Sequence, residues 1–329
     1  MRDPLERFGP VWGASGATNF FDQGWPFHEK LKRWCPGFNL DRMTFVAKTM
    51  TTDPREGNMP SEPLYQMPLE KRPKCIKINW RRAAALNAVG LTNRGAKTLF
   101  AIGKWQEMKY PLFLSFAPQG ANAEERYQDA VKFGEIALRE IPRFHALVGL
   151  QLNITCPNTG DDVTGSNADA LVEEAMAMLT ELAVVGIPIV VKVNALMPPE
   201  AAMKIGGHAA CAGITASNAL PWASLPGLGI DRVRLFGSDE SPLAEFGGGG
   251  LSGAPLFPIV ERWVKSVREA GFRKHLNAGG GIMKASHPEL LKYAGADSVS
   301  IGSMLFLRPW RTESTIDMAR RAFLWGAHT

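Results

Sequence analysis

Short apolar runs that suit buried strands alternate along this chain with longer segments whose apolar residues recur at helical spacing. The predicted strands cover residues 11–15, 44–47, 112–116, 147–154, 187–193, 213–216, 275–278 and 298–301. The predicted helices cover residues 123–140, 168–185, 199–205, 256–270 and 288–293. A strand followed by a helix, repeated in this way, is typical of parallel strands joined by crossover helices. The pattern predicts an α/β fold, a (β/α)₈ TIM barrel, although periodicity alone leaves open a doubly wound sheet.

Two long segments interrupt this alternation. Residues 58–82 are rich in proline, lysine and arginine, and residues 218–250 are rich in proline and glycine. Loops of this length inside a compact domain usually form lids or binding loops. Because no stretch has the composition of an interdomain linker, we expect one domain over residues 1–329. We expect the long inserted loops to lie over the C-terminal mouth of the barrel.

Composition excludes several classes of protein. The chain has 329 residues, of which 45% are hydrophobic and 21% are charged, which permits a large core and argues against disorder. The net charge of +5 suits anionic small molecules at least as well as nucleic acid. The longest apolar run, 182–191, is shorter than the ~20 residues of a membrane helix, and the N-terminal residues are charged where a signal peptide is apolar. The four cysteines have no disulfide or metal-ligand spacing. We therefore expect a cytoplasmic enzyme without membrane, nucleic-acid or metal binding.

Small or polar residues follow nearly every predicted strand. In parallel α/β proteins the carboxyl ends of the strands bind ligands, and in a barrel these ends converge on one mouth. One such residue would carry no information, but a series of them predicts a shared binding site. The residues are Ser15, Gly16, Lys48, Thr49, Asn153, Lys192, Ser217, Asn218, Gly280, Gly281, Gly302 and Ser303.

The late glycine clusters and two lysines suggest an anionic ligand. Glycines near 247–253, 279–281 and 302 suit a phosphate, because backbone N–H groups must approach its oxygens closely. Flexible turns would explain 247–250 alone, but the other two clusters each follow a predicted strand. A buried, unpaired lysine is costly, so Lys48 and Lys192 at strand ends indicate either function or side chains that reach solvent. No Walker loop or dinucleotide-binding motif accompanies them.

The segment 151–158 combines amides with a thiol. Asn153 and Asn158 can both donate and accept hydrogen bonds, as a substrate with carboxylate and ring amide groups requires. Cys156 is a candidate base or nucleophile if its pKa is lowered, and a small buried apolar residue otherwise. The second interpretation is the one we adopt for Cys35, Cys75 and Cys211.

Six motifs resemble those of dihydroorotate dehydrogenases: AKTMTTDPREGNMP, LNAVGLTN, LNITCPN, VVKV, GGLSG and AGGGI. The resemblance covers residues 14–303 and implies an FMN-dependent barrel that oxidises dihydroorotate to orotate in pyrimidine synthesis. It implies FMN contacts from Ser15, Lys48, Thr49, Asn153, Lys192, Ser217, Gly253, Gly280, Gly281, Gly302 and Ser303, with the phosphate on the last five. It implies substrate contacts from Lys48, Asn87, Gly90, Leu91, Asn153, Asn158 and Asn218.

The resemblance also assigns chemistry. Cys156 matches the catalytic base of the soluble class, and Lys192 would stabilise negative charge on the reduced flavin. A homodimer is implied, whereas fumarate, a quinone, or NAD through an electron-transfer subunit remain open as acceptors. Ala219 replaces a serine common in the family, so another dihydropyrimidine or cyclic amide stays an alternative substrate.

Two further classes remain as rivals. One is a phosphate-binding lyase or isomerase barrel without flavin. The other uses the basic stretch 71–82 to dock nucleic acid or a partner protein, but a solvated insertion explains that stretch better because no nucleic-acid-binding motif accompanies it.

Overall fold

Eight parallel strands form a closed barrel in the computed structural model, which describes residues 3–62, 67–70, 72–155, 167–216 and 218–325. The strand order is β1-β12-β11-β8-β7-β6-β5-β2. A parallel bridge between Trp12 and Thr44 joins the first strand to the segment entering the last and completes the ring. The strands are β1 (Val11–Gly13), β2 (Phe45–Val46), β5 (Leu112–Phe116), β6 (Val148–Asn153), β7 (Ile189–Val193), β8 (Cys211–Ala216), β11 (His275–Gly279) and β12 (Ser298–Ile301). The predicted TIM barrel is confirmed.

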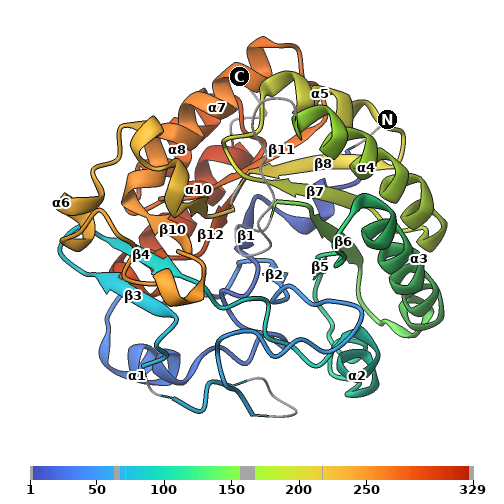
Figure 1. Ribbon diagram of the computed structural model, residues 1–329, viewed down its shortest axis with the longest axis horizontal. Helices are drawn as coiled ribbons and strands as arrows, with labels where there is room; N and C mark the ends of the chain where they lie inside the picture. Colours follow the sequence, from blue (N-terminus) through green and yellow to red (C-terminus); the bar gives the residue numbers. More distant parts are fainter. Residues whose placement is uncertain (1–2, 63–66, 71, 156–166, 217, 326–329) are drawn as a thin grey trace.

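Helices surround the barrel, as Figure 1 shows for α3, α4, α5 and α7. The helix α3 begins where the Asn122 side chain accepts a hydrogen bond from the Glu125 N–H at 2.9 Å, which caps its first turn. Its apolar face packs onto the strands through Phe133, whose ring stacks on Phe116 at 3.9 Å. The helices are α1 (Pro26–Trp34), α2 (Ala96–Ala101), α3 (Ala123–Glu140), α4 (Asn167–Leu182), α5 (Pro199–Gly207), α6 (Arg232–Phe236), α7 (Phe257–Glu269), α8 (His287–Tyr293), α9 (Met304–Leu307) and α10 (Thr312–Trp325).

The interior of the barrel changes from apolar to polar along the strands. At the N-terminal end, Trp12, Phe113 and Val190 pack in one cluster with Leu5 and Phe8. Side chains two positions further along a strand point the same way, and at that level the buried inward residues are polar. They are Ser115, Gln151, Lys192, Thr215, Asn277 and Ser300. The barrel is therefore closed by a hydrophobic plug at one end and presents a polar layer beneath the other.

Both long segments contribute to a second sheet, so the expectation of loops alone is corrected. This antiparallel sheet has the order β3 (Ile76–Asn79), β4 (Ala84–Asn87), β10 (Gly250–Gly253) and β9 (Leu220–Pro221). Figure 1 shows β3 and β4 beside β10 at one side of the barrel. Leu86, Leu220 and Leu251 form part of its own small core. The glycine-rich strand β10 lacks the alternating side chains that reveal a strand, and its partner β4 lies far away in the sequence.

No helix among the described residues is long and apolar enough to cross a lipid bilayer.

The helix α1 carries a buried histidine that couples stability to pH. His28 is 1% exposed and packs against the rings of Phe27 and Phe38. Burial, reinforced by the charge of Lys32, lowers the pKa of His28 from 6.5 to about 4. Between these values the unfolded chain binds a proton that the folded chain does not, so the free energy of unfolding falls as pH falls from about 6.5 to about 4.

We expect His28→Phe to reduce this loss of stability. Urea unfolding at about pH 7.5 and about pH 5 measures it, and the wild type should lose roughly 2 kcal/mol more than the variant between the two conditions. An identical pH dependence in both proteins would show that His28 titrates normally.

Candidate active site

Three predicted site residues lie at the carboxyl ends of barrel strands and are buried. Asn153 on β6 is the register partner of Lys192 on β7, and Lys192 is in turn the partner of Thr215 on β8. Lys48 follows β2 and is 9% exposed, while Lys192 is 6% exposed. Two ammonium groups with so little access to water require anionic or hydrogen-bonding surroundings.

Asn218 connects the end of β8 to the end of β6. Its side-chain NH₂ donates to Asn153 Oδ1 and to Thr155 Oγ1, each at 2.8 Å, and to the Thr155 carbonyl at 2.9 Å. The Asn218 backbone N–H donates to the Val193 carbonyl at 3.3 Å. These bonds orient both amides, because each side chain is buried and has few alternative partners. Thr155 was missed by the sequence analysis, although it lies between Asn153 and Cys156.

A chain of hydroxyl groups links the ends of β1, β2, β5 and β6. Ser15 Oγ donates to the Ala47 carbonyl at 3.0 Å and lies 2.8 Å from Thr49 Oγ1. Thr49 Oγ1 lies 2.9 Å from Ser115 Oγ, which donates to Gln151 Oε1 at 3.3 Å. The sequence analysis missed Ser115 and Gln151. The sequence feature that could have indicated each of them is a polar residue inside an otherwise apolar strand.

The predicted phosphate glycines pack three loops tightly together. A Cβ on Gly281, whose φ is +76°, would lie 2.4 Å from Phe257 N and 2.8 Å from Gly253 O. A Cβ on Gly253, whose φ is +105°, would lie 2.2 Å from the Ala83 carbonyl. Only glycine permits this approach, which brings the loops after β10 and β11 to the first turn of α7.

Backbone donors are available at this junction. The N–H groups of Gly280, Gly281 and Ser303 have no hydrogen-bond partner within the part of the chain that the structure describes. The α7 N-terminus adds the positive end of a helix dipole. Gly302 lies close to the β1 end, since a Cβ there would be 2.7 Å from Ala14 Cβ. Such a set of N–H groups suits a phosphate.

A tight turn after β4 directs its carbonyls away from its N–H groups. Gly90 and Leu91 have φ of +71° and +58°, a left-handed pair that is uncommon for leucine. Five consecutive carbonyls each accept a hydrogen bond. The donors are Asn58 Nδ2 to Ala88 (2.7 Å), Asn58 N to Val89 (2.9 Å), Arg55 Nε to Gly90 (2.9 Å), Asn93 Nδ2 to Leu91 (2.7 Å) and Lys48 Nζ to Thr92 (2.5 Å).

The N–H groups of this turn are, by contrast, available to a ligand. For residues 89–92 they find no hydrogen-bond partner among the described residues. Successive N–H groups in a turn can form an anion-binding concavity. Asn87, at the end of β4, donates only a long 3.5 Å bond to the Gly250 carbonyl. The turn therefore has the chemistry of a carboxylate site.

Three predicted site residues, Cys156, Asn158 and Ser217, lie outside the described residues. Thr215 Oγ1 is buried and has no hydrogen-bond partner among the residues described. Buried hydroxyls are normally paired with protein, water or a bound molecule. Thr215 is the register partner of Lys192, so this hydroxyl lies in the polar layer beneath the mouth.

The closed barrel and its polar mouth define a (β/α)₈-barrel protein in which two groups of backbone N–H donors, one at the glycine junction and one at the turn of residues 89–92, have no hydrogen-bond partner among the described residues. Residues 37–319 match the family model described as dihydroorotate dehydrogenase. The chain belongs to the dihydroorotate dehydrogenase family.

Individual relatives agree with this assignment. The chain is 26% identical over 325 residues to the catalytic subunit of dihydroorotate dehydrogenase B (NAD(+)) from Desulforamulus reducens, covering 95% of this chain and 88% of that protein. The Geobacillus kaustophilus protein of that name is 30% identical over 270 residues, covering 80% of this chain and 74% of the relative. Dihydroorotate dehydrogenase A (fumarate) from Limosilactobacillus reuteri is 26% identical over 307 residues, covering 91% and 84%.

A solved structure supports the fold. The crystal structure of ligand-free DHODH from Eimeria tenella superposes with a TM-score of 0.60 at 14% identity, covering 86% of this chain and 78% of that one.

Proposed function

We propose that the protein is an FMN-dependent enzyme that oxidises dihydroorotate to orotate in de novo pyrimidine synthesis. The observation that carries this function is the turn at residues 89–92, whose N–H groups face away from five occupied carbonyls. Lys48 Nζ lies on one of those carbonyls and adds a positive charge beside the turn. A planar carboxylate such as that of orotate is the kind of group this arrangement binds.

The residues present suit FMN. The glycine junction and the α7 N-terminus provide donors for its phosphate, and the Thr215 hydroxyl is a buried polar group that lacks a protein partner among the described residues. We assign the phosphate to Gly253, Gly280, Gly281, Gly302 and Ser303. We assign the rest of the cofactor to Ser15, Lys48, Thr49, Asn153, Lys192 and Ser217. When bound, FMN supplies the acceptor for the hydride that leaves C6 of the substrate.

The remaining chemistry belongs to the chain itself. Cys156 Sγ, as thiolate, would remove the proton from C5 of dihydroorotate as a general base. Lys192 would hold a positive charge beneath the mouth, which stabilises negative charge that develops during the reaction. Lys48 and Lys192 are both buried, so little water surrounds their charges. Electrostatic interactions are stronger in such surroundings.

Amides would orient the substrate ring. The Asn218–Asn153–Thr155 bonds hold two amides in defined directions across β6 to β8. We assign substrate contacts to Lys48, Asn87, Gly90, Leu91, Asn153, Asn158 and Asn218. Because each amide has both donors and acceptors, this set can recognise the ring imide as well as the carboxylate.

The decisive experiment is an absorbance spectrum of the purified protein before and after addition of dihydroorotate. We expect the spectrum of oxidised flavin, and we expect dihydroorotate to bleach it. A flavoprotein that dihydroorotate does not bleach would instead act on another dihydropyrimidine or cyclic amide. A protein that takes up no FMN would favour a phosphate-binding lyase or isomerase.

We predict that Gly281→Ala weakens FMN binding by at least about tenfold. The added Cβ would overlap Phe257 N at 2.4 Å and must separate the loops that form the phosphate junction. Fluorescence titration of the apoprotein with FMN measures the Kd. Gly227→Ala is the matched control, because a Cβ there meets nothing within 4 Å. Equal FMN affinity in the two variants would place the phosphate elsewhere.

The acceptor and the assembly are the finer parts of this proposal. The relatives' names include both NAD(+) and fumarate, so either acceptor, or a quinone, is compatible with the family. We propose a cytoplasmic homodimer of single-domain chains, with an electron-transfer subunit if NAD is the acceptor. Activity assays of the purified chain with fumarate and with a soluble quinone identify a direct acceptor. If neither supports turnover while dihydroorotate still bleaches the flavin, NAD through an electron-transfer subunit is favoured.

A further inference from the structure

We propose that Arg55 is a positioning residue that sets the direction of the Leu91 N–H in the substrate-binding turn, supported by Gln119. This inference rests on the proposed function, because the turn is taken to bind the substrate carboxylate. Arg55 and the turn both lie in the connection between β2 and β5, whereas Gln119 lies between β5 and α3, so a second loop would act together with Arg55 on the turn.

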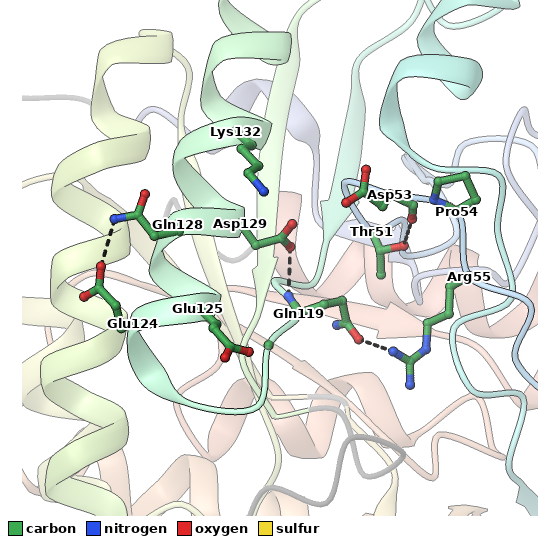
Figure 2. Close-up of a pocket in the computed structure, with 11 residues that line it drawn as sticks. Thr51, Asp53, Pro54, Arg55, Gln119, Glu124, Glu125, Gln128, Asp129 and Lys132 are labelled. Carbon is green, nitrogen blue, oxygen red and sulfur yellow. Dashed lines mark hydrogen bonds between the residues drawn. The ribbon is translucent and has the colours of Figure 1, made fainter.

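Arg55 is held at both its backbone and its side chain. Its backbone N–H and carbonyl each pair with Asn93 at 2.8 Å. Its Nε donates to the Gly90 carbonyl at 2.9 Å, and its Nη1 donates to Gln119 Oε1 at 2.6 Å. Figure 2 shows the bond between Arg55 and Gln119 at the edge of a pocket of about 460 Å³.

Gln119 is itself anchored to the barrel. Its backbone N–H donates to Asp129 Oδ2 on α3 at 2.8 Å, as drawn in Figure 2. Its side-chain NH₂ donates to the Pro118 carbonyl at 2.7 Å, which directs the amide oxygen towards Arg55. The Arg55 guanidinium is therefore held in place by Gln119 where it reaches Gly90. Its planar set of donors bonds to the Gly90 carbonyl and to Gln119 Oε1 at the same time.

The geometry of the peptide unit gives Arg55 its function. The carbonyl of Gly90 and the N–H of Leu91 belong to one planar peptide and point in opposite directions. While Arg55 holds the carbonyl outwards, the Leu91 N–H points into the concavity of the turn. The positive φ of Leu91 is unfavourable for a residue with a Cβ, so the turn needs this support to persist. Without it, rotation of the peptide would replace a donor by a carbonyl oxygen and repel a carboxylate.

The test uses Arg55→Met, Arg55→Lys and Gln119→Leu, with Lys132→Met as the matched control. Lys132 lines the same pocket and carries the same charge, but it makes no hydrogen bond to the turn among the described residues. Calorimetric titration gives the Kd of orotate, steady-state kinetics give KM and kcat for dihydroorotate, and fluorescence gives the Kd of FMN.

We expect Arg55→Met to raise the Kd of orotate and the KM of dihydroorotate by about tenfold or more. We expect kcat at saturation and the Kd of FMN to stay within about threefold. Arg55→Lys should recover part of the affinity, since an ammonium can still donate to Gly90. Gln119→Leu should give a smaller rise, because it loosens Arg55 without removing it, and Lys132→Met should match the wild type.

The opposite results overturn the proposal. The first is an orotate Kd in Arg55→Met equal to that of the wild type. The second is an equal loss of kcat, FMN affinity and orotate affinity in Arg55→Met, which would indicate general misfolding. If Arg55→Met does not fold, Gln119→Leu decides, and an unchanged orotate Kd there rejects the positioning role. If the wild-type protein binds no orotate, the proposed function itself is rejected. If the wild-type protein oxidises dihydroorotate but Arg55→Met leaves the orotate Kd unchanged, only this inference is rejected.

Discussion

We expect Cys156→Ser to retain FMN and orotate binding but to be reduced by dihydroorotate roughly 10²–10⁴-fold more slowly near pH 7. A serine hydroxyl keeps nearly the size of the thiol, but its proton is far less acidic, so almost no alkoxide is present to accept the C5 proton. Stopped-flow mixing with dihydroorotate under anaerobic conditions, followed at the oxidised flavin band, measures the rate directly.

Two controls make this result specific to the base. Cys35→Ser changes a half-buried cysteine at the C-terminal end of α1, which was predicted to have no catalytic role, and this variant should be reduced at the wild-type rate. The wild-type reduction rate should also rise with pH as the Cys156 thiol ionises, whereas the serine variant should lack that step. Wild-type kinetics in Cys156→Ser would move the base to another residue.

Lys192→Met is expected to slow flavin reduction by roughly 10²–10³-fold or to weaken FMN binding. Lys192 is 6% exposed and lies in register between Asn153 and Thr215, so its charge acts through a medium with little water. Its removal takes away the positive charge that favours the reduced, anionic cofactor. The flavin reduction potential should therefore become more negative.

Spectroelectrochemical titration measures that potential independently of turnover. Lys97→Met, which removes an exposed lysine on α2, is the charge-matched control and should leave the potential unchanged. A Lys192→Met protein with wild-type potential and full activity would show that Lys192 has only a structural role.

The barrel was predictable because its strands are buried on both faces. Residues 112–116 and 298–301 form strands with the predicted bounds, since short segments of apolar and small residues bounded by turn residues have few alternatives. The helix predicted over residues 123–140 is confirmed for the same reason, with its bounds set by the Asn122 cap. These strands and this helix can be predicted from local sequence, because residues that are close in the sequence determine their structure.

The second sheet was not predictable in this way. β10 contains Gly250 and Gly253, which carry no side-chain pattern, and its register with β4 joins residues more than 160 positions apart. Thr155, Ser115 and Gln151 were likewise overlooked, because one polar residue near or in an apolar strand does not reveal its partner. The roles of Cys156, Asn158 and Ser217 remain predictions from family resemblance.

The sequence by itself determined the alternation of parallel strands and helices and the positions of Lys48, Asn153 and Lys192 at strand ends, because burial and strand direction follow from local patterns of apolar residues. Closure of the sheet into a barrel is seen only in the structure. Only the tertiary structure decided which groups meet in the mouth. The carboxylate site proposed at residues 89–92 consists of backbone N–H groups, which every residue except proline possesses, and its character depends on carbonyls held by Arg55, Asn58 and other distant donors. Such a site depends on the geometry of the backbone, so no particular residue type in the sequence indicates it.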